Sequence, residues 1–88
     1  MKPKEGFLLR EIDNTSIVVA TGSAVTEFSG LITLNRTGTF LWHCLEKGAS
    51  EEELVASLIS EYEISEEIAR KDVQAFVARA REAGLLED

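Results

Sequence analysis

The chain has 88 residues, the size of one small domain with little room for a deep catalytic pocket beside its core. Sixteen acidic residues against nine basic ones give a net charge of −7, which disfavours nucleic-acid phosphates and suits neutral or basic protein partners. No apolar run is long enough for a signal peptide or a membrane span, and the single cysteine, Cys44, suits a reducing compartment, so we expect a cytoplasmic protein with no membrane partner.

The first part of the chain predicts three strands. Residues 1–6 are polar and contain the only proline, so we expect a loose N-terminal arm. Residues 7–12 and 15–21 have strand character on either side of the turn signal Asp13-Asn14, which predicts an antiparallel hairpin. Alternation over residues 31–34 predicts a third strand. Residues 22–30 fit either a bulged extension of that strand or an irregular loop.

Three helices are expected after the strands, each with its own start or stop signal. The first begins at residue 36 or 37, is capped by Asn35 and ends before Gly48. Residues 50–53, Ser-Glu-Glu-Glu, fit a capping box at the start of the second helix. Ser65 caps the third helix, which we expect to end near Ala83.

The order of elements defines the expected fold class. Three strands followed by three helices in one domain, residues 1–88, predict an α+β fold with the helices on one face of a three-stranded antiparallel sheet. Residues 85–86 are expected to fold back onto the core. This arrangement is like that of a winged helix-turn-helix domain.

The sequence contains few groups for catalysis or metal binding. His43 and Cys44 are adjacent, so on a helix they point about 100° apart and do not share a site in the usual way. No second cysteine or histidine completes a metal-binding set. The carboxylates directly after the helix caps suit the helix dipole. We therefore expect no enzyme activity, no metal and no cofactor.

Two alternatives come from other classes of protein. The third helix contains side chains that can read DNA, and these are Arg70, Lys71, Gln74, Arg79 and Arg81. Acidic neighbours dilute them and are spaced to pair with them. A winged-helix DNA-binding regulator is one alternative, although the charge argues for no nucleic-acid partner. A structural dimerisation domain is the other, and whether the chain forms a homodimer stays open.

Peptide binding at a sheet edge is the function that the pattern favours. An edge strand offers unpaired N–H and C=O groups, so an extended peptide can add to it, while side-chain pockets supply selectivity. If the third helix lies beside the third strand, it is expected to supply these pockets through Val73, Phe76, Val77, Ala80 and Ala83. The same five helix residues also fit the plain core of the domain.

The stretch where sheet changes to helix carries a family resemblance. Residues 30–42, Gly-Leu-Ile-Thr-Leu-Asn-Arg-Thr-Gly-Thr-Phe-Leu-Trp, resemble the PqqD family. Glu52-Glu53-Leu54, Glu61-Tyr62, residues 69–76 and the ending at residues 83–87 reinforce the resemblance, which extends from about residue 7 to the C-terminus.

The resemblance implies a leader-peptide recognition element for ribosomally made precursor peptides. In such domains the leader adds as a strand against the third strand and lies in a groove beside the third helix. Carried onto this chain, the resemblance implies that the strand contacts are Leu31, Ile32, Thr33, Leu34 and Asn35 and that the groove wall is the face from Val73 to Ala83. The domain presents the precursor to a maturation enzyme, commonly a radical S-adenosylmethionine protein, and itself does no chemistry. Residues 22–29 form a longer segment than we expect for members dedicated to pyrroloquinoline quinone. Because the fold also serves lasso-peptide and related pathways, the cognate precursor stays open.

Overall fold

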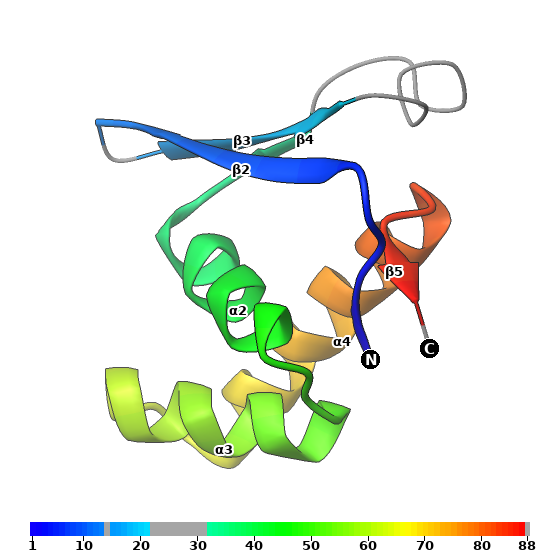
Figure 1. The fold of residues 1–88 in the computed structure, drawn as a ribbon. Coiled ribbons are helices and arrows are strands. Elements are labelled where there is room, and N and C mark those ends of the chain that lie inside the picture. The colour runs from blue at the N-terminus through cyan, green and yellow to red at the C-terminus, as the bar shows by residue number, and fades with distance from the viewer. Residues whose placement is uncertain (14, 22–31, 88) are drawn as a thin grey trace.

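The computed structural model describes residues 1–13, 15–21 and 32–87. The described elements are β1 (Lys2–Pro3), β2 (Phe7–Ile12), β3 (Thr15–Ala20), β4 (Ile32–Leu34), α2 (Arg36–Glu46), α3 (Glu51–Tyr62), α4 (Glu66–Glu82) and β5 (Leu86–Glu87). The sheet β2-β3-β4 lies over α2, and α3 lies on the far side of α2 from the sheet (Figure 1). This arrangement confirms the predicted α+β fold, a three-stranded antiparallel sheet followed by three helices.

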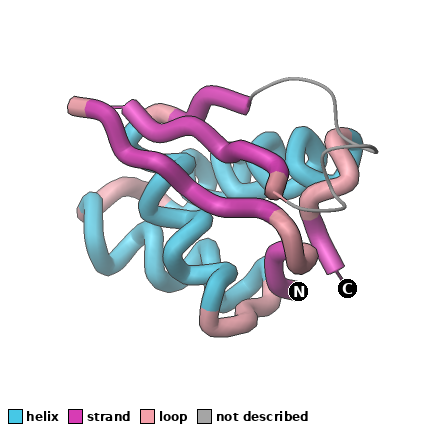
Figure 2. The backbone as a smooth tube through the Cα atoms, turned by 45° about the horizontal axis from the view of Figure 1, so that its top comes forward, coloured by secondary structure: helices cyan, strands magenta, loops and turns pink. Residues whose placement is uncertain are grey.

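The central strand of the sheet is β3. It pairs antiparallel with β2 over the whole length of both strands, and with β4 from Ser16↔Leu34 to Val18↔Ile32. The hairpin predicted around Asp13 is therefore confirmed. Within the described part of the chain β4 pairs with β3 alone, so it forms one edge of the sheet, as the tube in Figure 2 also shows. Residues 22–31, and with them the choice between a bulged strand and a loop, lie outside the described residues.

One hydrophobic core joins the inner face of the sheet to α2, α3 and α4. Trp42 is the largest of its deeply buried side chains, and Leu41 and Leu45 on the same helix are completely buried. Leu85 and Leu86 also fold back into this core, as predicted. The other buried apolar residues are Val18, Ile32, Leu34, Leu54, Val55, Leu58, Ala69, Val73, Val77 and Ala80.

The helix boundaries follow the local capping signals. Asn35 caps α2, and Ser50 and Glu53 form the predicted capping box at the start of α3. The Ser65 hydroxyl accepts a hydrogen bond from the Ile68 N–H at 3.2 Å and so caps α4. Gly84 ends that helix with a φ of +76°, a left-handed conformation that costs glycine little. All three predicted caps are confirmed.

The N-terminal arm differs from the loose segment that the sequence predicts. Strands β1 and β5 pair antiparallel, with Lys2 opposite Glu87 and Pro3 opposite Leu86. The Ala49 N–H also donates a hydrogen bond to the carbonyl oxygen of Met1 at 3.0 Å. The two ends of the chain therefore lie side by side (Figure 1). These contacts join residues far apart in sequence, so no local pattern indicates them.

His43 lies on the surface of α2, as predicted, and connects this helix to the hairpin. Its Nε2 lies 2.9 Å from Glu11 Oε1, and its Nδ1 lies 2.8 Å from Glu46 Oε1. Both hydrogen bonds and the two negative charges raise the pKa of His43 above its ordinary value of 6.5. Cys44 is part-buried and packs against the core.

We expect the stability of the domain to fall as pH rises above 6.5, the ordinary pKa of histidine. The folded state binds the His43 proton more tightly than the unfolded state does. The stabilisation is therefore fully present below the unfolded pKa and is lost as pH rises through the raised folded pKa. Since His43 and Glu11 are 52% and 58% exposed, solvent screening limits the effect to less than about 1 kcal/mol.

Urea unfolding of the wild type and of His43→Gln measures the effect. It is carried out at pH values below 6.5 and above the raised pKa of His43. The difference in unfolding free energy between the two proteins should shrink as pH rises. A difference that does not change with pH would mean that the protonated imidazole does not stabilise the fold.

Candidate functional site

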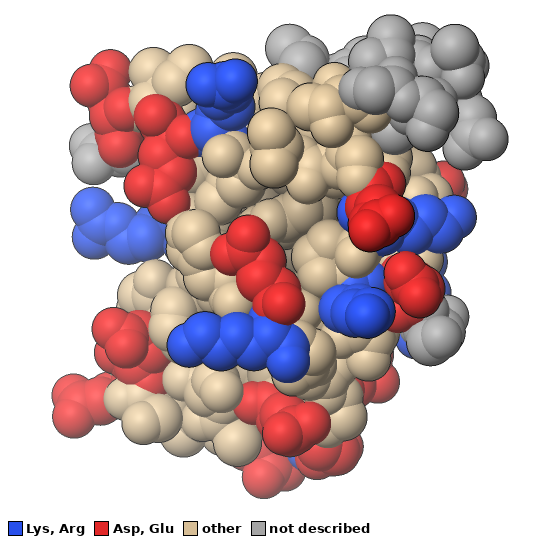
Figure 3. Space-filling model, in the orientation of Figure 1, with Lys and Arg blue, Asp and Glu red and all other residues tan. Residues whose placement is uncertain are grey.

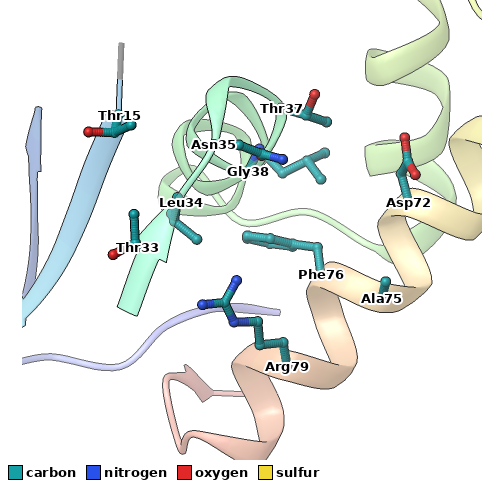
Figure 4. Close-up of a pocket in the computed structure, with 11 residues that line it drawn as sticks. Thr15, Thr33, Leu34, Asn35, Thr37, Gly38, Asp72, Ala75, Phe76 and Arg79 are labelled. Atoms are coloured by element: carbon teal, nitrogen blue, oxygen red, sulfur yellow. The ribbon is translucent and has the colours of Figure 1, made fainter. Parts of the chain in front are cut away.

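A groove of about 460 Å³ lies between α4 and the corner where β4 passes into α2 (Figure 4). It brings together residues from both halves of the chain. Its walls are Thr15 on β3, Thr33 and Leu34 on β4, Asn35 at the corner, Thr37, Gly38 and Leu41 on α2, and Asp72, Ala75, Phe76 and Arg79 on α4. The groove therefore runs beside the edge strand of the sheet.

The strand side of the groove contains three of the residues expected from the sequence. Thr33 is exposed, Leu34 is 5% exposed, and Asn35 follows directly at the corner. Ile32 lies on the same buried face of the strand as Leu34, but it is not part of the groove wall and packs in the core. Leu31 lies outside the described residues, so its part in the site stays a prediction.

The corner between β4 and α2 is held by short polar contacts. The Asn35 Oδ1 accepts a hydrogen bond from the Gly38 N–H at 2.8 Å. Thr39 Oγ1 lies 2.7 Å from the hydroxyl of Ser16, which is 2% exposed, and 3.0 Å from the Asn35 carbonyl oxygen. These bonds tie the first turn of α2 to the last residues of β4 and to β3.

Gly38 allows this corner to be tight. A Cβ atom at this position would lie 3.3 Å from both the Leu34 Cβ and the Asn35 Oδ1. That is tighter than most contacts of a Cβ atom, so with a larger residue the side chain of Leu34 or Asn35 would have to shift by a few tenths of an ångström. The glycine therefore sets the shape of this groove wall.

The helix side of the groove differs from the sequence prediction. Val73, Val77 and Ala80 are 0%, 2% and 4% exposed and face the core, so they do not line the groove. Ala83 is the C-terminal cap of α4 and packs against the core, also outside the groove. Of the five helix residues expected, the groove wall contains Phe76, which is part-buried and points between β4 and α2 (Figure 4).

The difference between the expected and the observed groove residues of α4 has a geometric reason. Successive residues of a helix are 100° apart, so Asp72, Phe76 and Arg79 form a stripe beside the apolar one. The apolar stripe meets the core, and the stripe next to it faces the groove. The spacing of i, i+4 and i+7 is visible in the sequence, but only the position of the neighbouring strand shows which side of the apolar stripe is open.

Two arginine side chains of α4, Arg70 and Arg81, contact other residues of the domain. Arg70 forms a two-point ion pair with Glu52, with N–O distances of 2.6 and 3.2 Å, and lies 3.7 Å from Glu66. The guanidinium of Arg70 lowers the pKa of Glu52. Arg81 lies 3.8 Å from the sulfur of Met1. Basic and acidic side chains are interspersed on the face in Figure 3, which does not favour a surface for nucleic-acid phosphates.

Among residues 1–13, 15–21 and 32–87, no group of three or more His, Cys, Asp or Glu side chains is placed to hold a metal ion. Over the same ranges no helix combines the length and the apolar character that crossing a membrane requires.

The comparisons with known proteins agree with this fold. The chain is similar to TbiB1 in complex with the TbiA(beta) leader peptide, with a TM-score of 0.79 and 23% identity over 99% of this chain and 95% of that one. It is also similar to lasso peptide synthetase B1 complexed with the leader peptide, with a TM-score of 0.76 and 22% identity over 99% and 96% of the two chains. At these identities the likeness shows a shared fold.

The family assignment rests on the sequence itself. None of the curated proteins matches the chain. The family model described as "Coenzyme PQQ synthesis protein D (PqqD)" matches residues 8–86. This range includes every residue that lines the groove. This chain belongs to the PqqD family.

Proposed function

We propose that this chain is a leader-peptide recognition element that binds the leader of a ribosomally made precursor peptide. The leader adds as a strand to the free edge of β4 and lies in the groove beside α4. The observation that carries this proposal is the coincidence of an edge strand and a groove: β4 pairs with β3 alone among the described strands, and the groove opens beside it. Both similar structures are complexes with leader peptides.

Two kinds of contact account for binding. Main-chain hydrogen bonds along β4 hold an extended peptide whatever its sequence, and apolar contacts with Leu34 and Phe76 select among peptides. The net charge of −7 favours encounters with basic peptides. A short strand with a few apolar anchors corresponds to a micromolar dissociation constant, about −8 kcal/mol.

The buried residues of α4 have a supporting role in this proposal. Val73, Val77 and Ala80 hold the helix against the core, and thereby hold Phe76 at the groove. We also propose Leu31, the residue before β4 in the sequence, as a peptide contact.

We propose further that the domain does no chemistry and presents the bound leader to a maturation enzyme, for which a radical S-adenosylmethionine enzyme is the expected partner. This role places the domain in the cytoplasm, where ribosomal peptides are made. Sedimentation of the chain over a range of concentrations distinguishes a monomeric adaptor from the dimerisation domain considered above.

The test is an NMR titration of the ¹⁵N-labelled chain with the leader segment of a short precursor encoded beside its gene. We expect the largest shifts at the backbone amides of β4, Asn35, Phe76 and Arg79. Amides on the exposed side of α3, such as Ala56 and Ser60, should stay in place. Binding without shifts at β4 would contradict the site, and the absence of binding by every neighbouring precursor would contradict the function.

A further inference from the structure

The groove contains two charged side chains of opposite sign on the same helix. Asp72 and Arg79 are both exposed and both line the groove. Neither forms an ion pair or a side-chain hydrogen bond within the described part of the chain, whereas Arg70 on the same helix is bound by two carboxylates. Both charges are therefore available to a molecule that enters the groove.

The spacing of the two charges fits an extended peptide. They are seven residues apart on α4, which is about two turns or roughly 10 Å along the helix axis. Phe76 lies between them, and Arg79 reaches towards Thr33 and Leu34 (Figure 4). An extended strand rises about 3.3 Å per residue and its side chains alternate between two faces, so residues four positions apart, about 13 Å, share the face that meets the groove and bracket the two charges.

Main-chain hydrogen bonds alone do not define the direction of a guest strand. An edge strand accepts a partner in either a parallel or an antiparallel orientation. Reversing a peptide that carries one charge of each sign would place like charges together at both ends of the groove. Such repulsive contacts are a general source of selectivity.

We propose that the groove selects an extended peptide with an acidic side chain opposite Arg79, a basic side chain opposite Asp72 and an apolar side chain between them on Phe76. The order of the two charges sets the direction in which the guest strand runs. This inference rests on the proposed function and adds the charge pattern and the direction of the bound peptide.

The experiment selects binders for the full chain from a displayed library of short random peptides. We expect enriched sequences with an acidic and a basic residue about four positions apart and an apolar residue midway between them, because these three side chains share one face of an extended strand. The double variant Asp72→Arg/Arg79→Asp keeps the net charge and should enrich the opposite charge order. Since both side chains are exposed, the variant should fold, and circular dichroism checks this.

A matched control exchanges charges on the same helix outside the groove. Lys71→Glu/Glu82→Lys also keeps the net charge, and both of its positions are exposed. It should enrich the same charge order as the wild type. Isothermal titration with one selected synthetic peptide should then show affinity at least about tenfold weaker for the groove variant and unchanged for the control.

The outcomes separate this inference from the function on which it rests. If the groove variant enriches the same charge order as the wild type, or if the selected peptides share only an apolar residue, the inference is wrong and peptide binding stands. If neither protein enriches any peptide, the proposed function fails together with the inference.

Discussion

The substitution Ala80→Glu should leave most molecules of the domain unfolded. Ala80 is 4% exposed and belongs to the core face of α4. A glutamate there has no room and no partner for its charge, and leaving a buried charge uncompensated costs about 3–5 kcal/mol. That cost is comparable to the whole stability of a small domain. Urea unfolding followed by circular dichroism measures it.

The matched control for this substitution is Ala78→Glu. Ala78 lies on the same helix and is exposed, so the same change should alter the unfolding free energy by less than about 0.5 kcal/mol. The sequence alone assigns Ala80 to the groove, where a glutamate would weaken peptide binding and leave the fold intact. A stably folded Ala80→Glu protein with weakened peptide binding would restore that assignment and contradict the packing described here.

The substitution Phe76→Ala should lower affinity for the leader peptide by about tenfold to a hundredfold, or roughly 1.4–2.7 kcal/mol. Phe76 contributes the aromatic ring of the groove wall and is part-buried before any peptide binds. A bound strand would cover the rest of the ring. Isothermal titration of the variant with the leader peptide gives the change in affinity.

Two controls separate binding from folding in this experiment. Ile68→Ala removes a large apolar side chain that is 53% exposed on the same helix and lies outside the groove wall, so it should leave affinity unchanged. Phe76→Leu keeps an apolar contact and should bind with intermediate affinity while remaining folded. Equal affinity for Phe76→Ala and the wild type would move the peptide site away from this groove.

Much of the local structure follows from the sequence because it depends on neighbouring residues. Asn35, Ser50 and Ser65 cap their helices through bonds to residues three positions on. The strand-forming residues of β2 and β3 and the turn at Asp13 define the hairpin in the same way. Each of these signals therefore lies within a few residues of the element that it predicts, and the order of the elements gives the fold class.

The tertiary structure decides which surfaces meet. Pairing of β1 with β5 joins the two ends of the chain, and no local signal in a polar N-terminal segment indicates such a partner. The groove wall on α4 has a similar origin. Val73 and Ala80 have the apolar character expected of a groove, but that stripe is buried in the core, so the open wall is formed by Asp72, Phe76 and Arg79.

The sequence by itself thus determines the elements, their order and the strand at which we propose that a peptide binds. The side of α4 that meets this peptide depends on how the helix is rotated against the core. That rotation follows from packing many side chains that are distant in the chain, and the pattern of a single helix does not contain it.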